Sequence, residues 1–122
     1  MIVFDSNALL RYILQDQAEM ANSVEEKIKT STCYVPAEVV AEMVYVLSKV
    51  YEIPRKDISE ALLTVLTIDS ISVDSYEVLA KGLCTFAETK LDFVDCLMVG
   101  YHHSGYTVFS FDKELNKHLQ KQ

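Results

Sequence analysis

The chain is poor in residues that interrupt a fold or cross-link it: it has three glycines, two prolines and three cysteines in 122 residues. Because no low-complexity or linker-like stretch occurs, we expect a single domain over residues 1–122, long enough to bury its own core. The cysteines are odd in number and show no CxxC spacing. This argues against a disulfide framework and against a thiolate metal site.

Long apolar runs are also missing, since no stretch approaches the roughly 20 residues that a membrane helix needs. The start MIVFDSN lacks the basic residues that open a secretory signal. We therefore expect a cytoplasmic protein without membrane contact. Positive charge is scarce as well: 11 Lys and Arg stand against 18 Asp and Glu, a formal net charge of −7. This charge argues against a domain that binds nucleic acid through its overall electrostatic field. It allows a local site that holds divalent cations, and it suits a basic protein partner.

Short strand-like runs alternate with amphipathic helical patterns along the chain. The runs at 2–4, 33–35, 71–73 and 107–111 predict strands. Helices are expected at 6–14, 16–29, 36–51, from 54, 74–87, 92–103 and 113–119. Strands that alternate with helices predict an α/β fold, here a three-layer α/β/α domain with a central parallel sheet of four strands.

Two of these predicted strands, the first and the last, run directly into an aspartate, Asp5 and Asp112. In open α/β sheets, ligand sites gather beyond the carboxyl ends of the strands. If the two strands lie side by side, their carboxylates meet, and the repulsion between them favours a cation. Each aspartate could instead cap the helix that follows it, although Ser6 or Asn7 could cap the first helix and leave Asp5 free.

Glu42 interrupts the most apolar helical pattern of the chain, residues 39–47. It shares a helical stripe with Glu38, Tyr45 and Lys49, so that the pattern alone is equally typical of a solvated helix face. The residues around Glu42 leave open whether it belongs to a functional site or to a solvated helix face.

Asp92 and Asp95 are three residues apart and therefore share one face at the start of a predicted helix. Both could act as capping or dipole-stabilising acids. Asp95, however, lies between apolar Val94 and Leu97 in a helix that is largely buried. A carboxylate held there needs a partner, and a metal ion would serve.

Taken together, the acids fall in motifs that resemble those of the PIN-domain ribonucleases, in the order and spacing of the VapC-like toxins. The opening IVFDSNALLRYIL resembles the first strand and helix of that family, and VPAEVVAEMVYVLSKVY its second motif. The segment LDFVDCLMVGYHHSGYTVFSFDKEL is similar to the third and fourth motifs. The family commonly adds a fifth strand after the fourth motif, but the polar end KHLQKQ departs from that pattern.

The resemblance implies an acidic pocket for one or two Mg²⁺ or Mn²⁺ ions. Its catalytic and metal-binding residues would be Asp5, Glu42, Asp95 and Asp112, with Asp92 as an additional acid and Asn7 and Ser110 as supporting polar groups. The scattered basic residues nearest the motifs are candidates for holding RNA phosphates, each with an ordinary surface charge as the alternative: Arg11, Lys49, Arg55 and Lys90.

These expectations together describe a Mg²⁺- or Mn²⁺-dependent endoribonuclease in which metal-activated water hydrolyses the phosphodiester bond. The resemblance further implies the toxin of a toxin–antitoxin pair, with RNA as substrate, a basic antitoxin as partner and a homodimer. Two alternatives stay open, a non-catalytic acidic interaction module and a phosphoaspartyl receiver-like switch. The receiver would require an acid pair after the first strand and a lysine where Asp112 stands.

Overall fold

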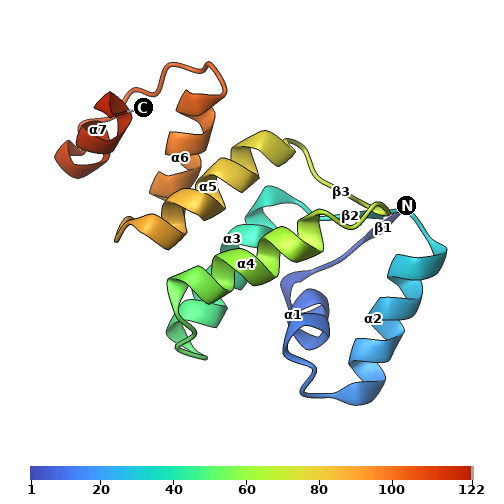
Figure 1. Ribbon diagram of the computed structural model, residues 1–122. Coiled ribbons are helices and arrows are strands. Elements are labelled where there is room, and N and C mark those ends of the chain that lie inside the picture. Colours follow the sequence, from blue (N-terminus) through green and yellow to red (C-terminus); the bar gives the residue numbers. More distant parts are fainter. Residues whose placement is uncertain (122) are drawn as a thin grey trace.

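The computed structural model describes residues 1–121, which form a small parallel sheet and a series of packed helices (Figure 1). The strands are β1 (Ile2–Val3), β2 (Cys33–Tyr34) and β3 (Ile71–Ser72), in the order β1-β2-β3. Both pairings are parallel, and Cys33 is the register partner of Ile2 and of Ile71. The predicted α/β class and the parallel strand direction are thereby confirmed.

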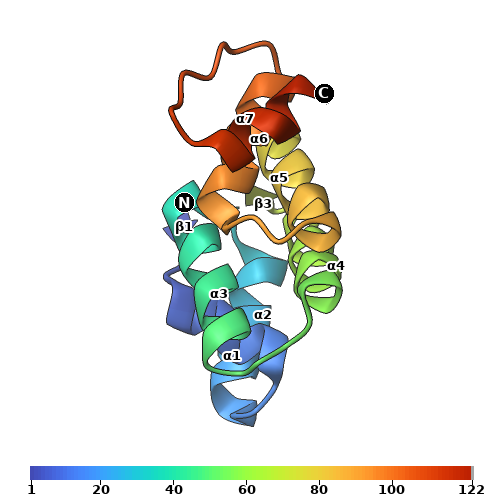
Figure 2. The ribbon, with the colours of Figure 1, turned by 90° about the vertical axis from the view of Figure 1, so that its left-hand side faces the viewer.

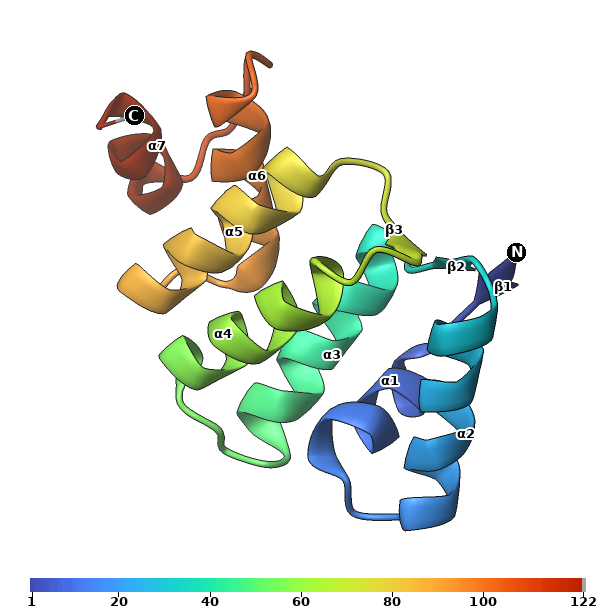
Figure 3. The ribbon, with the colours of Figure 1, turned by 45° about the vertical axis from the view of Figure 1, so that its right-hand side comes forward.

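Seven helices connect and follow the strands within residues 1–121. They are α1 (Ser6–Leu14), α2 (Ala18–Thr30), α3 (Ala37–Lys49), α4 (Arg55–Leu66), α5 (Tyr76–Glu88), α6 (Phe93–His103) and α7 (Lys113–Gln120). Helix α1 packs on α2 and α3, α4 packs on α3 and α5, and α6 packs on α5, α3 and α7. The chain thus runs from the sheet and α1 at one end of the molecule to α7 at the other (Figures 1 and 3).

The core follows the helical periodicity of the sequence. On α3, residues Val40, Met43, Val44 and Leu47 recur at helical spacing and are buried, as the apolar pattern predicts. The corresponding stripes of α2 and α4 face the same cluster. This packing fixes α3, which carries Glu42 on its outer face, against the rest of the domain.

Helices α5 and α6 approach each other closely at a glycine. A Cβ atom added to Gly100 would lie 2.4 Å from the carbonyl oxygen of Val78, a separation that no side chain tolerates. Helix α6 ends at His103, and Gly105 follows with a φ of 101°, the left-handed conformation that favours glycine after a helix. The predicted end of this helix at residue 103 is confirmed.

The expected fourth strand over residues 107–111 is wrong for this structure. The segment forms no strand, and Phe109 and Phe111 are 84% and 89% exposed. The reason is its position: it follows α6 at the end of the molecule opposite β1, and it arcs away from the helices (Figure 2). Within residues 1–121 the sheet therefore has three strands rather than four or five, and the outer edge of β1 is open.

Candidate active site

A cavity of about 380 Å³ separates α3 from the start of α6. Its walls come from four helices and the turn before α6: Ala41, Val44, Tyr45, Ser48, Lys49, Arg55, Phe86, Asp92, Phe93, Val94 and Asp95. The cavity thus places Asp92 and Asp95, at the start of α6, opposite a tyrosine and a lysine of α3. It is the concave surface on which the predicted site residues converge best.

Asp95 is the acid whose surroundings most favour a cation. The carboxyl is half-buried in the first turn of α6, and its pKa is raised by burial and then by the charges of Asp112 and Asp92. Asp92 stands at the N-cap position of α6, but its side chain makes no capping hydrogen bond. The charges of Asp112 and Asp92 therefore disfavour the ionised form of Asp95, and a bound cation would relieve that repulsion.

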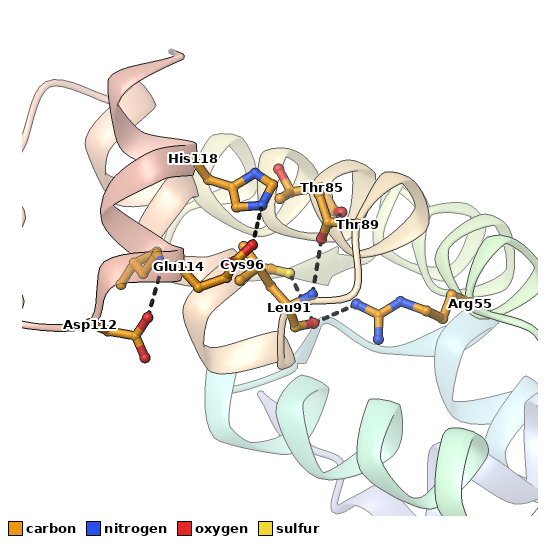
Figure 4. A network of polar contacts seen from close by, with 9 residues as sticks. Arg55, Thr85, Thr89, Leu91, Cys96, Asp112, Glu114 and His118 are labelled. Carbon is orange, nitrogen blue, oxygen red and sulfur yellow. Dashed lines mark hydrogen bonds and ion pairs between the residues drawn. The ribbon is translucent and has the colours of Figure 1, made fainter.

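The two aspartates that were predicted to follow strands, Asp5 and Asp112, are both helix caps. An Asp5 Oδ1 accepts a hydrogen bond from the Ala8 N–H at 2.8 Å, and Asp112 Oδ1 accepts one from the Leu115 N–H at 2.9 Å (Figure 4 shows the second). Of the two alternatives that the sequence left open, the structure has Asp5, rather than Ser6 or Asn7, as the cap of α1. Capping occupies one carboxylate oxygen and fixes the orientation of each exposed side chain, because the helix end is rigid.

Glu42 is held by a residue that sequence reasoning did not assign to the site. The buried hydroxyl of Ser6 donates a hydrogen bond to Glu42 Oε1. The only sequence signal for Ser6 was its place directly after a strand-end aspartate. Because Tyr45 and Lys49, on the same stripe of α3, line the cavity, this stripe borders a concave site as well as solvent.

The structure divides the four predicted acids into two groups. Asp95 and Asp112 lie in the C-terminal part with Asp92, whereas Asp5 and Glu42 are joined through Ser6 in the N-terminal part. No fourth strand lies beside β1 within residues 1–121, so the strand pairing that would bring Asp5 and Asp112 together is absent from this part of the chain. Accordingly, no three His, Cys, Asp or Glu residues in positions 1–121 are gathered as metal ligands.

Arg55 fastens the turn that precedes α6 (Figure 4). Its Nε donates to the carbonyl oxygen of Phe86 at 2.7 Å, a terminal nitrogen donates to that of Leu91, and the guanidinium carbon lies 3.6 Å from the centroid of the Phe86 ring. The thiol of Cys96 also donates to the Leu91 oxygen at 3.7 Å, and burial raises its pKa to about 11, which keeps it protonated. These contacts set the position of the first turn of α6.

The other predicted basic residues differ in availability. Arg11 is engaged by Asp16 at 2.6 Å and by the Tyr51 hydroxyl at 3.2 Å; the Tyr51 hydrogen bond is the main cause of its raised pKa. Lys49 is exposed and lines the cavity, and Lys90 is exposed in the turn before α6. The two lysines are therefore better placed to meet a ligand than the two arginines.

The two supporting polar residues also take different positions. The Ser110 hydroxyl accepts a hydrogen bond from the Asp112 N–H at 3.0 Å, and the Ser110 carbonyl accepts one from the Asn116 side chain at 2.9 Å. Ser110 thereby helps to hold the backbone of Asp112. Asn7 is exposed in the first turn of α1.

These observations define the class of protein: it is an α/β domain with parallel strands and an acid-lined cavity at the start of a helix. The family model of the PIN domain matches residues 2–118, and the chain belongs to that family. It is 28% identical over 102 residues to the VapC ribonuclease of Aquifex aeolicus (strain VF5), covering 80% of this chain and 75% of that protein. No solved structure matches significantly.

These findings confirm the resemblance inferred from the four motifs. Within residues 1–121, every helix is too short or too polar to span a bilayer.

Proposed function

We propose that this single-domain chain is a metal-dependent endoribonuclease that hydrolyses RNA phosphodiester bonds, and that it acts as the toxin of a toxin–antitoxin pair. Membership of the PIN family and the similarity to a protein named VapC ribonuclease support the class of reaction. The observation that carries the proposal is the half-buried carboxyl of Asp95 in the cavity wall, with two further acids that raise its pKa.

The donor set fits a hard divalent cation. Carboxylate oxygens are the ligands that Mg²⁺ and Mn²⁺ prefer, and thiolates and imidazoles are not among the residues that line the cavity. Of the predicted acids, Asp95, with Asp92 and Asp112 as its charged neighbours, would bind the ion first, and Asp5 and Glu42 are the further candidate ligands. A bound ion there would supply an activated water and stabilise charge on the scissile phosphate.

The protein's own side chains would position the substrate. Lys49 and Lys90 supply positive charge near the acids and would hold backbone phosphates on either side of the scissile bond. Tyr45 is 63% exposed on the cavity wall and offers an aromatic face on which an RNA base can stack. Single-stranded RNA would then cross the cavity with its backbone toward α6.

The protein partner would be a basic antitoxin. With a formal net charge of −7, the chain attracts a cationic segment, and the acid-lined cavity is where such a segment would block the substrate. The same charge argues that RNA affinity depends on the divalent cation, because the protein surface alone repels phosphate.

The decisive test is cleavage of single-stranded RNA with Mg²⁺ or Mn²⁺ compared with EDTA, using Asp5→Asn as the variant. Asparagine caps a helix as well as aspartate does, so the fold is expected to persist while a charged ligand is lost. We expect cleavage to require the cation and to fall by at least about a hundredfold in the variant. Asp69→Asn, an exposed acid outside the cavity, is the matched control and should cleave at the parent rate.

Two results would contradict the proposal: cleavage that persists in EDTA, or an Asp5→Asn protein that is folded and fully active. Membership of the PIN family argues against the receiver-like switch. Incubation with acetyl phosphate distinguishes the two, because a labile phosphoaspartate would form in a receiver and not in a nuclease. A non-catalytic module would bind a basic partner without any metal-dependent cleavage.

A further inference from the structure

The cavity between α3 and the start of α6 has an aromatic floor. Phe86 and Phe93 are buried there and contact each other edge to face, with 5.9 Å between their ring centroids and 83° between their planes. With a volume of about 380 Å³, the cavity falls within the roughly 300–1,000 Å³ that is typical of small-molecule sites. A floor of aromatic rings favours a ligand with a flat, apolar face.

The rim of this cavity carries exposed side chains from the two helices. Tyr45 of α3 is 63% exposed and Val94 of α6 is 59% exposed, so each leaves apolar surface in contact with water. A flat ring that entered the cavity would stack on the tyrosine and cover the valine. Lys49, one helical turn after Tyr45, adds a positive charge to the same rim. A flat apolar ring that carries an anionic group, as a nucleotide does, matches this surface.

Two polar side chains lie deeper in the cavity. Arg55 is half-buried and uses Nε and Nη2 to bond the carbonyls of Phe86 and Leu91. Its other terminal nitrogen, Nη1, makes no such bond within residues 1–121 and points away from the turn before α6 (Figure 4). Ser48 is half-buried on the α3 side, and its hydroxyl can donate or accept a hydrogen bond. The deeper part of the cavity therefore offers a fixed donor and one adaptable group.

We propose that this cavity is a nucleobase subsite that takes one unpaired guanine of the RNA; the proposal rests on the function proposed above. Guanine presents two acceptors, O6 and N7, on one edge, whereas adenine and cytosine place an amino donor there. Arg55 has only donors to offer, so its Nη1 pairs with the guanine edge and would meet a donor in adenine or cytosine. Uracil presents one acceptor and a single ring, and therefore gains less from both the arginine and the tyrosine.

The acids on the same wall connect the subsite to the reaction. Asp92 and Asp95 line the cavity together with Tyr45 and Lys49. A base held in the cavity would leave its phosphate on the side of these acids, so the bound base would select which bond meets the cation. A nucleotide in a duplex cannot enter, because its faces are stacked on its neighbours. The preference for single-stranded RNA and for guanine would thus come from the cavity and not from the acids.

Titration with 5′-mononucleotides tests the subsite on the intact protein, because a phosphomonoester offers no phosphodiester bond to cleave. With Mg²⁺ present, guanosine monophosphate should shift the amide resonances of residues 44–49 and 93–95. It should bind more tightly than the adenosine, cytidine and uridine nucleotides, and ribose 5-phosphate controls for binding through the phosphate alone. Loss of the N7 acceptor in the 7-deazaguanosine nucleotide should weaken binding about 2- to 10-fold. Equal affinity for all four nucleotides, or shifts confined to other residues, would overturn the proposal.

Two variants test the cavity from the side of the protein. Tyr45→Ala removes the stacking surface and should weaken the binding of guanosine monophosphate at least about fivefold. Ser48→Leu fills the cavity and should have an effect of the same direction. Tyr76→Ala, on α5 and 46% exposed outside the cavity, is the matched control and should bind as the parent does. Thermal unfolding checks that each variant is folded. A folded Tyr45→Ala protein with the parent's affinity would overturn the subsite, whatever the result for Ser48→Leu.

Cleavage of RNA with one abasic position links the subsite to the reaction. In a single-stranded RNA that the parent cleaves, removal of the guanine base beside the cut should slow cleavage at least about fivefold. Tyr45→Ala should cleave the intact and the abasic RNA at the same, reduced rate. A parent protein that cleaves both RNAs equally fast would overturn the subsite. If the parent cleaves no RNA at all, the nuclease proposal fails, and the mononucleotide titration still decides whether the cavity binds guanine.

Discussion

The hydroxyl of Ser6 donates a hydrogen bond to the carboxylate of Glu42, which joins the first turn of α1 to the outer face of α3. The serine is buried and the glutamate is exposed, so one carboxylate oxygen is anchored while the side chain still reaches solvent. Asp5, the residue before Ser6, is fixed because it caps the first turn of the same helix. The first turn of α1 therefore orients both acids of the N-terminal group.

Ser6→Ala should impair the site more than the fold. Loss of one hydrogen bond costs about 1 kcal/mol of stability, whereas loss of a residue that orients a metal ligand typically costs about 10- to 100-fold in metal affinity or activity. Mn²⁺ titration and RNA cleavage measure the second effect, and thermal unfolding measures the first. Ser23→Ala on the exposed face of α2 is the control. Equal Mn²⁺ affinity in both variants would show that Ser6 does not position Glu42.

Arg55→Lys should loosen the turn before α6 although the charge is retained. A lysine cannot donate from two directions to the carbonyls of Phe86 and Leu91, and an unpaired carbonyl that is shielded from water costs about 1–3 kcal/mol. We expect lower thermal stability and faster hydrogen exchange at residues 89–93. Lys56→Arg, the neighbouring exposed position, should change neither quantity. A stable variant with slow exchange in the turn would assign Arg55 to a different role.

The local sequence pattern predicted the helices and three of the strands because the periodicity of these elements depends only on neighbouring residues. The stripes of α2, α3 and α4 are buried as expected, and all three short strands lie where β-branched or aromatic runs occur. The run at 107–111 has the same pattern but forms no strand within the chain. A strand requires a partner edge, and the distance from that segment to β1 is a property of the tertiary packing.

The candidate site likewise has some features that local sequence reveals and others that depend on tertiary contacts. Asp95 could be identified as a candidate site residue from its apolar neighbours, because a half-buried carboxylate loses part of its hydration and needs a partner. The capping roles of Asp5 and Asp112 were visible as alternatives, and the structure decided them. The hydrogen bond from Ser6 to Glu42 and the hydrogen bond from Arg55 to Leu91 each span 36 residues of sequence. No local pattern could therefore reveal them.

Gly100→Ala should destabilise the protein more than Gly82→Ala, although both glycines lie between α5 and α6. The added Cβ at Gly100 meets a backbone oxygen at 2.4 Å, whereas at Gly82 it meets the end of the flexible Leu97 side chain at 3.1 Å. Forcing the helices apart costs roughly 1–3 kcal/mol. Chemical denaturation of both variants measures the difference, and equal loss would mean that the helices separate without strain.

Asp95→Asn should raise the stability of the metal-free protein at neutral pH. Burial and the charges of Asp112 and Asp92 raise the folded-state pKa of Asp95, so its favourable contribution exists below the unfolded pKa, near 3.8, and is lost as the pH rises through the folded value. Asparagine has no charge to bury, and we expect the stability advantage of the variant to grow as the pH is raised from about 4 to neutral. Melting temperatures in EDTA across this range measure it, with Asp69→Asn as the control. Mg²⁺ should reverse the order, because the parent gains a ligand that the variant lacks; a variant less stable than the parent in EDTA at neutral pH would refute the argument.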